Sequence, residues 1–242
     1  MPKRASRRFF DDLNSLFLTF SSIINNFIIG EVKNLKLRIV GSHPLWAHFV
    51  WNAAKVMSDY LDAPEFKVED KNVLELGAGV ALPSLICVLN KARHVVATDY
   101  PDHDLIENIA FNIDNNIPLE LRSRARSAGF LWGTDIKPLL ELAGGSKFDV
   151  VILSDVIFNH NCQEDLLKTC KEALSEKGQV LVSFSHHKPN RAHLDLRFFE
   201  LAEKQFGFKV EKKFSLLMKP MFEKDFGDES MRATVQFYVL TM

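Results

Sequence analysis

From residue 72 onward, short apolar runs rich in β-branched residues alternate with stretches of helical periodicity. Strands that are apolar along their whole length are typical of a parallel sheet covered by helices on both faces. The alternation therefore predicts an α/β fold with a mostly parallel sheet. The expected strands are 72–77, 94–99, 127–132, 148–155 and 178–185. The expected helices are 81–91, 102–116, 135–143, 162–175 and 190–206.

The C-terminal end of the chain departs from this alternation. Segments 208–217 and 233–241 are both strand-like, and we expect no helix between them. Two successive strands without a crossover helix pair antiparallel, so they should form a hairpin at one edge. Five parallel strands followed by such a hairpin predict the Rossmann-like seven-stranded methyltransferase sheet. Dehydrogenases of the Rossmann class have six parallel strands instead.

The N-terminal segment 1–34 is expected to be an accessory helical extension. Its apolar residues between Leu13 and Ile28 recur at spacings of three and four, which is one face of an amphipathic helix, and Gly30 would end it. Basic residues precede the apolar stretch, so a targeting presequence or a membrane-surface helix is the alternative. The many Asn and Ser residues make the stretch too polar to span a bilayer.

Residues 35–242 are expected to form one domain, because no Pro-, Gly- or Ser-rich linker divides them. Segment 35–41 predicts a short strand and 46–61 a helix ahead of the sheet. The net charge is −1 and the basic residues are not clustered, so we expect no nucleic-acid partner. The three cysteines have no paired or metal-binding spacing, which favours a reducing, cytoplasmic location and no metal.

The strongest motif is VLELGAGVALPS at 73–84. An apolar strand carries Glu75 near its end, and Gly77 and Gly79 then turn the chain into the next helix. Glycine is needed there because a ligand must approach the backbone closely and a positive φ must be tolerated. A dinucleotide-binding loop would have a third glycine where Leu82 stands, so pyrophosphate binding is disfavoured.

Asp99 ends the second parallel strand, twenty-two residues after Gly77. A carboxylate at this strand end lies across from the glycine loop and can accept hydrogen bonds from both hydroxyls of a ribose. Capping the following helix is the alternative role, but Asp102 is better placed for it. A ribose occurs in both NAD and S-adenosylmethionine; Leu82 and the terminal hairpin favour the second.

The ends of the third and fourth strands carry further candidates. Trp132 could cover the adenine or the ribose, with a place in the core as the alternative. Ser154, Asp155, Asn159 and His160 follow the apolar fourth strand. Ligands of open α/β sheets bind outside the carboxyl ends of the strands, so at least one of these four residues should belong to the site.

Taken together, the motifs resemble the family-16 protein methyltransferases, also called nicotinamide-N-methyltransferase-like. The likeness is to the branch that methylates the N terminus and adjacent lysine of translation elongation factor 1-alpha. The matching segments are GSHPLWAHFVWNAAKVMSDYL, VLELGAGVALPS, TDYPD, LWG, SDVIFNH, FSHHKPNRAHLDLRFFE and FGDESMRATV.

This resemblance implies S-adenosyl-L-methionine as the cofactor and a protein as the methyl acceptor. It also implies an enzyme that methylates the N-terminal amine or a lysine of elongation factor 1-alpha, and we expect a monomer without stable membrane association. From the resemblance and the motifs together, the expected cofactor-binding residues are Trp51, Glu75, Gly77, Ala78, Gly79, Asp99, Trp132 and Ser154.

Methyl transfer from a sulfonium to an amine needs a group that holds the amine and accepts or relays its proton, because a protonated amine cannot attack. Asp155 is the first candidate for this role, and Asn159 and His160 are the second. His186 and His187, after the fifth parallel strand, could take part or could anchor their loop.

Phe158 and Trp46 could form the wall of the acceptor site and favour the methylammonium product through their ring faces. A small-molecule amine methyltransferase of the nicotinamide type remains an alternative, since it would share the same cofactor residues. A non-catalytic adaptor would have lost Gly77, Gly79 or Asp99, and all three are present. An NAD oxidoreductase is disfavoured by Leu82.

Overall fold

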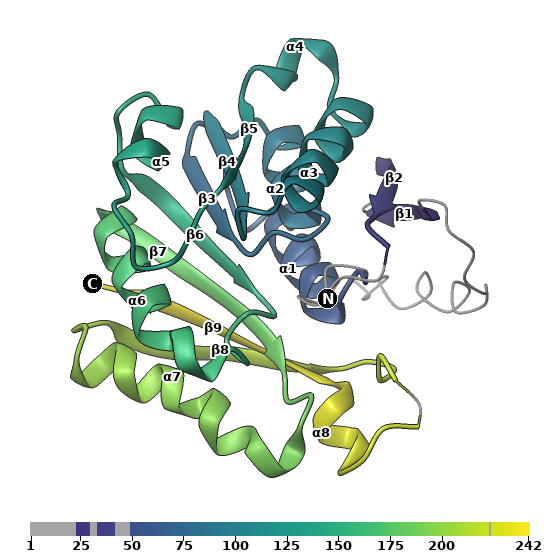
Figure 1. Cartoon of the computed structure of the whole chain (residues 1–242), viewed down its shortest axis with the longest axis vertical. Coiled ribbons are helices and arrows are strands. Elements are labelled where there is room, and N and C mark those ends of the chain that lie inside the picture. The colour runs from purple at the N-terminus through teal and green to yellow at the C-terminus, as the bar shows by residue number, and fades with distance from the viewer. Residues whose placement is uncertain (1–22, 30–32, 42–48, 223) are drawn as a thin grey trace, which may run out of the picture.

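The computed structural model describes residues 23–29, 33–41, 49–222 and 224–242 (Figure 1). Its centre is a seven-stranded sheet in the order β5-β4-β3-β6-β7-β9-β8. The strands are β3 Asn72–Leu76, β4 His94–Asp99, β5 Ala125–Gly129, β6 Phe148–Ser154, β7 Leu174–Ser185, β8 Lys209–Leu217 and β9 Thr234–Thr241. The first five in spatial order pair parallel, whereas β9 pairs antiparallel with both β7 and β8. The predicted fold class is confirmed.

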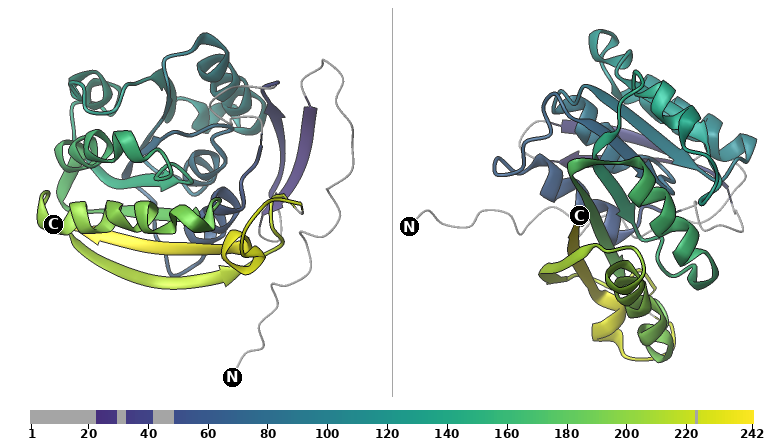
Figure 2. Two further views of the ribbon diagram at one scale, coloured as in Figure 1. Left: turned by 60° about the horizontal axis from the view of Figure 1, so that its bottom comes forward. Right: turned by 90° about the vertical axis from the view of Figure 1, so that its left-hand side faces the viewer.

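Helices cover both faces of this sheet (Figures 1 and 2). On β3, Val73 packs in one apolar core with Leu85 of α2, whereas Leu74 packs in a second core with Leu167 of α6. Both cores are buried, which explains why the central strands are apolar throughout. The helices are α1 Asn52–Asp62, α2 Leu82–Leu89, α3 His103–Asn116, α4 Leu119–Arg122, α5 Lys137–Leu142, α6 Gln163–Ala173, α7 Ala192–Lys204 and α8 Glu229–Ala233, with 3₁₀ turns at His160–Cys162 and Pro189–Arg191.

The strand register brings the carboxyl ends of the parallel strands to one edge of the sheet. Asp99 at the end of β4 pairs with Gly129 at the end of β5, and Ser154 at the end of β6 pairs with Ser183 of β7. The loops that follow neighbouring parallel strands therefore lie side by side at this edge. In open α/β sheets, ligands bind at these loops.

The structure differs from the sequence prediction at β5 and between β8 and β9. The strand expected at 127–132 is Ala125–Gly129, because the chain turns after it: the Thr134 amide donates to the Leu131 carbonyl (3.3 Å). A short helix, α8, also lies between β8 and β9, where none was expected. Its start is fixed by the Asp228 carboxylate, which accepts the Ser230 and Met231 amides.

The helical extension predicted for 1–34 is wrong where the structure describes it. Ile23–Ile29 forms strand β1, which pairs antiparallel with β2 (Lys33–Ile39); residues 1–22 lie outside the described part. Over a short apolar run, the spacing of apolar residues can fit either a helix or a strand. Ile and Phe favour strands, and pairing with a seven-residue partner strand stabilises the strand here. The division expected at residue 34 falls inside β2. The helix expected at 46–61 begins at Asn52, and 46–48 are not described.

Candidate functional site

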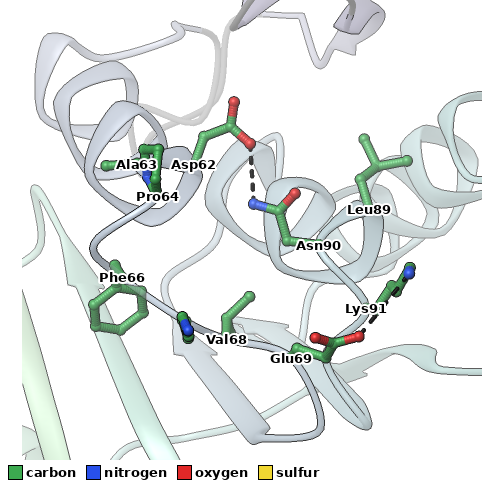
Figure 3. A pocket seen from close by; sticks show the side chains of 10 residues that line it. Asp62, Ala63, Pro64, Phe66, Val68, Glu69, Leu89, Asn90 and Lys91 are labelled. Carbon is green, nitrogen blue, oxygen red and sulfur yellow. Dashed lines mark hydrogen bonds and ion pairs between the residues drawn. The ribbon is translucent and has the colours of Figure 1, made fainter.

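One pocket, of about 380 Å³, lies away from the carboxyl edge of the sheet (Figure 3). It is formed by the C-terminal ends of α1 and α2 and by the segment that leads into β3. Three of the charged groups on its wall have polar partners: Asn90 donates to the Asp62 carboxylate (2.9 Å), and Lys91 lies 3.9 Å from Glu69. The residues with predicted chemistry lie elsewhere, at the carboxyl ends of the parallel strands.

The predicted meeting of the glycine loop with the second strand is present. Gly77 and Gly79 both have left-handed backbones, with φ of 73° and 55°. The Gly79 amide donates to Oδ2 of Asp99 (2.7 Å), and the Ala78 amide donates to the Thr98 carbonyl (2.8 Å). These two bonds therefore join the loop to the end of β4. We call residues 77–79 together with Asp99 the glycine–aspartate cradle.

The two glycines have different surroundings. A Cβ on Gly77 would stand 2.6 Å from Cγ1 of Val156 and 3.5 Å from the Trp132 ring, so no side chain fits there. A Cβ on Gly79 would meet no atom within 4 Å. The Gly79 backbone therefore faces open space that a ligand can enter, while Gly77 lets the Trp132 ring and the loop after β6 pack closely.

Glu75 lies beneath the cradle, with 1% of its surface exposed. Its Oε2 accepts the Ser84 amide (3.0 Å) and the Ser84 hydroxyl, whereas Oε1 has no hydrogen-bond partner among the described residues. Burial raises the pKa of the Glu75 carboxyl to about 8; the Ser84 bonds oppose this rise and the Asp99 charge adds to it. Glu75 is therefore mostly protonated at neutral pH without a nearby cation.

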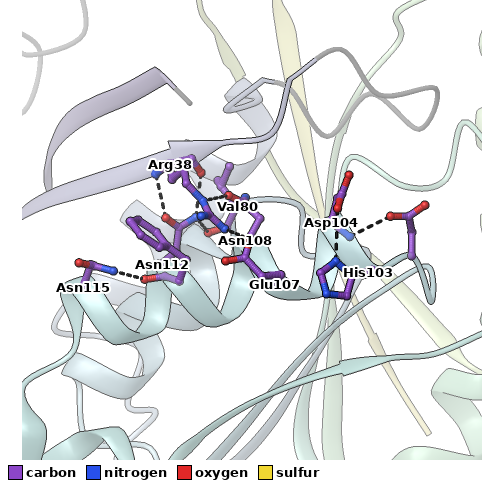
Figure 4. A network of polar contacts seen from close by, with 10 residues as sticks. Arg38, Val80, His103, Asp104, Glu107, Asn108, Asn112 and Asn115 are labelled. Atoms are coloured by element: carbon purple, nitrogen blue, oxygen red, sulfur yellow. Dashed lines mark hydrogen bonds and ion pairs between the residues drawn. The ribbon is translucent and has the colours of Figure 1, made fainter. Parts of the chain in front are cut away.

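Side chains of α3 link β2 to the residue that directly follows the cradle (Figure 4). Asn112 accepts the Arg38 amide (2.8 Å) and donates to the Arg38 carbonyl (3.0 Å), and Asn116 makes the same pair of bonds to Lys36. Four residues along a helix span about 6 Å, which is close to the roughly 6.6 Å spanned by two residues along a strand. Asn112 and Asn116 can therefore both bond to the backbone of the same strand edge. Asn112 also donates to the carbonyl of Val80, directly after the cradle (3.1 Å).

Asp155 lies next to the cradle, one residue beyond the end of β6. It is a buried residue in the left-handed region (φ 57°), and its amide continues the β6–β7 ladder by donating to Ser183 (2.8 Å). Its carboxylate is gripped by His187, whose Nε2 lies 2.9 Å from each oxygen. Burial alone would lower the pKa of His187, but the carboxylate of Asp155, helped by more distant acidic groups, raises it above its usual value.

Among the described residues, neither Asn159 nor His160, the second candidates for holding the amine, bonds to the Asp155 carboxylate as His187 does. His160 is bound through Nε2 to Asp195 of α7 (2.7 Å), and Asn159 is exposed at the start of a 3₁₀ turn. His186 contacts the other oxygen of Asp195 through Nδ1 (2.7 Å). Of the two histidines after the fifth parallel strand, His187 reaches the site, and His186 anchors the loop.

Phe49, Trp51, Phe158 and Phe222 pack against His187 or against one another, and we call these four rings the aromatic enclosure. The Trp51 ring lies 5.0 Å from the imidazole of His187 and 5.3 Å from Phe49, which in turn contacts Phe222 at 5.3 Å. Phe158, 41% exposed, stands edge-on to His187 at 6.4 Å. The sequence predicted Phe158 but not Phe49 or Phe222, because no motif joins residues so far apart in the chain.

The remaining sequence-predicted residues are divided between the two parts of the site. Trp132 lies beside Gly77 in the turn after β5, and Ser154 ends β6 with a buried hydroxyl that no described residue satisfies. Trp51 belongs to the aromatic enclosure. Trp46, the other predicted wall residue, lies outside the described residues.

Comparisons with known proteins agree with this geometry. A model of a family described as lysine methyltransferase matches residues 33–205. The chain belongs to the lysine methyltransferase family. Two relatives named "Protein N-terminal and lysine N-methyltransferase EFM7" are similar to this methyltransferase: the Candida glabrata protein is 46% identical over 88% of this chain and 83% of its own. The Schizosaccharomyces pombe protein is 41% identical over 87% and 83%.

Solved structures share the fold of this methyltransferase. SMU.776 in complex with SAH, the demethylated cofactor, has a TM-score of 0.60 at 13% identity, over 93% of this chain and 58% of its own. Precorrin-6y C5,15-methyltransferase from Geobacter metallireducens has a TM-score of 0.52 at 13% identity, over 84% and 92%. The cofactor of the methyltransferase is S-adenosylmethionine. The open face of Gly79, the Asp99 carboxylate and the unsatisfied Ser154 hydroxyl suit a polar nucleoside ligand.

Proposed function

We propose that this methyltransferase methylates the N-terminal amine and a lysine of a protein substrate, translation elongation factor 1-alpha. One observation carries the proposal: a buried carboxylate, Asp155, lies directly beside the glycine–aspartate cradle and is paired with His187, on which the aromatic enclosure packs. The residue that follows it, Val156, packs against Gly77. The names of the relatives support the two kinds of amine, and the sequence resemblance supports the elongation factor.

The cradle would hold the nucleoside part of the cofactor. In this proposal Asp99 accepts hydrogen bonds from the ribose hydroxyls while Gly77, Ala78 and Gly79 let the ligand approach the backbone. Trp132 covers one face of the nucleoside, and the Ser154 hydroxyl gains the partner it lacks. Glu75 supports the loop from below through Ser84.

When bound, S-adenosylmethionine supplies an electrophilic methyl group, and the chain's own residues must present an amine to it in line. Holding two reactants in this way can lower the barrier by ~7–11 kcal/mol. The amine must be neutral to attack, so we assign Asp155 the task of orienting it and receiving its proton. His187 contacts both oxygens of Asp155 and so fixes the direction in which this carboxylate faces the amine.

The aromatic enclosure completes the acceptor site. Trp51 and Phe158 contact His187, and Phe222 packs on Trp51. Ring faces attract cations, including methylated ammonium groups. Such walls also exclude water from the reacting atoms. Phe158 is partly exposed, so a long side chain or a chain terminus can enter from outside.

We further propose that the enzyme acts in the cytoplasm as a monomer without stable membrane association. None of the three cysteines, all within the described part of the chain, forms a disulfide, which suits a reducing compartment. In the part of the chain that the structure describes, no helix has both the length and the apolarity needed to cross a membrane.

The test is an assay with labelled cofactor and two acceptors, purified elongation factor 1-alpha and nicotinamide, followed by mass spectrometry of the products. We expect label on the N-terminal amine or a lysine of the protein and none on nicotinamide. Asp155→Asn should abolish most of the transfer while its cofactor affinity stays within about twofold of the wild type. Transfer to nicotinamide alone would overturn the proposal.

A further inference from the structure

The acceptor site is built from two loops, one after β6 and one after β7, and a single side chain of α7 contacts both. Oδ1 of Asp195 lies 2.7 Å from Nε2 of His160, and Oδ2 lies 2.7 Å from Nδ1 of His186. Asp195 is 4% exposed. One buried carboxylate thus joins the loop that carries Asp155 to the loop that carries His187.

The adjacent residues His186 and His187 are directed to different carboxylates. His186 is held by Asp195 and packs its ring 5.2 Å from Phe184, while His187 is held by Asp155. Because the two side chains share one short backbone segment, the direction of the first constrains the direction of the second. Fixing His186 therefore fixes the imidazole that grips Asp155.

A second contact ties the loop after β6 to the same part of α7. The buried Gln163 amide donates to the carbonyl of Ile157 (3.0 Å) and to that of Leu194, the residue before Asp195 (2.9 Å). Asp155, Ile157 and His160 are thus held at three points within six residues. The left-handed backbone of Asp155 needs such support, because non-glycine residues in that region are strained.

Apolar packing alone would seat α7 on the sheet. Phe198 and Phe199 of this helix are buried in the second core. Burying a carboxylate costs desolvation free energy, and well-packed apolar residues often stabilise the folded protein as well or better. A contribution to folding stability therefore does not explain Asp195. Its contacts with His160 and His186 instead fix the positions of these two imidazoles.

We propose that Asp195 is a positioning residue for methyl transfer, which through His160 and His186 holds Asp155 and His187 in the arrangement that receives the amine. This inference rests on the proposed function, since it takes Asp155 as the residue that orients the acceptor. In this proposal Asp195 acts through the two histidines and contacts neither the substrate nor the cofactor.

The first variant is Asp195→Asn, which keeps the shape but offers only one acceptor oxygen. We expect kcat to fall about ten- to a hundredfold, the scale of a misplacement of about 1 Å, while cofactor Kd stays within about twofold. The matched control is Asp149→Asn, at the opposite end of β6. Its carboxylate also accepts two bonds, from the Asn72 amide (2.9 Å) and the Ser175 hydroxyl (3.3 Å), and its loss should leave kcat within about twofold.

A double-mutant cycle separates positioning from a structural effect. If Asp195 acts through Asp155, Asp155→Asn/Asp195→Asn should be no slower than Asp155→Asn alone. Asp155→Asn/Asp149→Asn should show the two single effects multiplied. Multiplied effects for the Asp195 pair, or an unimpaired Asp195→Asn, would overturn the inference.

Full activity of Asp155→Asn would instead reject the acceptor role in the proposed function, so the two failures are distinguishable. Should Asp195→Asn not fold, His160→Gln replaces it in the same cycle. That change removes one of the two contacts at a side chain that is 20% exposed, and the same non-multiplied result is expected.

Discussion

Replacing Glu75 by Gln tests the electrostatics beneath the cradle. The carboxyl is buried, one of its oxygens has no partner among the described residues, and burial raises its pKa from 4.5 to about 8. Glutamine keeps the size and can still accept the Ser84 bonds, but it does not titrate. The difference between the two proteins therefore isolates one ionisation.

The direction of the pH dependence of the unfolding free energy follows from the difference in the Glu75 pKa between the folded and unfolded states. The folded protein holds the Glu75 proton more tightly than the unfolded chain does, so this stabilisation is complete below pH 4.5 and is lost as the pH rises through about 8. Each pH unit inside that window corresponds to about 1.4 kcal/mol. From about pH 5.5 to about pH 7.5, the wild type should lose about 2.7 kcal/mol of unfolding free energy relative to Glu75→Gln.

Urea unfolding, followed by tryptophan fluorescence without added cofactor, measures both proteins at the two pH values. All other groups titrate in both proteins and cancel in the difference. A difference in unfolding free energy that does not change with pH would show that the Glu75 carboxyl is not held protonated, and the electrostatic reasoning would be wrong.

Three further outcomes are expected. Asp99→Asn should weaken cofactor binding by about 1.5–3 kcal/mol, the scale of lost charge-assisted hydrogen bonds; unchanged affinity by calorimetry would reject the ribose role. His187→Gln should remove a decline in unfolding free energy above about pH 6.5, because a raised pKa stabilises only while the imidazole is protonated; identical pH profiles in chemical denaturation would contradict this. Asn112→Ala should lower the unfolding free energy by about 1–3 kcal/mol and expose the β2 amides to hydrogen exchange. Asn115→Ala on the exposed side of α3 is its control, and equal protection in both variants would count against the link between α3 and β2.

The cradle could be predicted from the sequence because it depends only on where residues lie at the ends of neighbouring strands. Gly77 and Gly79 lie at the end of one strand and Asp99 at the end of the next parallel strand, so any parallel sheet must bring them together. The Gly79–Asp99 hydrogen bond needs nothing beyond that placement. Periodicity failed at Ile23–Ile29, where Ile and Phe fit both a helix face and a strand and the partner strand decided.

The proposed acceptor site was only partly predictable, because it depends on contacts between distant residues. The sequence favours His160, which is close to Asp155 in the chain, over His187. The pairing of β6 with β7, however, brings His187 to the carboxylate from 32 positions away. Phe222 comes from the loop after β8 and carries no motif of its own. The proposed role of Asp195 depends on its contacts from α7 to both loops, which no spacing along the sequence predicts.

A crystal structure with S-adenosylhomocysteine would test the assignment of the carboxyl edge most directly. We expect a ribose hydroxyl within hydrogen-bond distance of the Asp99 carboxylate, the ligand backbone over Gly79, and the sulfur on the side that faces Asp155. Electron density for the ligand away from these residues, or a cradle filled by the chain's own side chains, would contradict it.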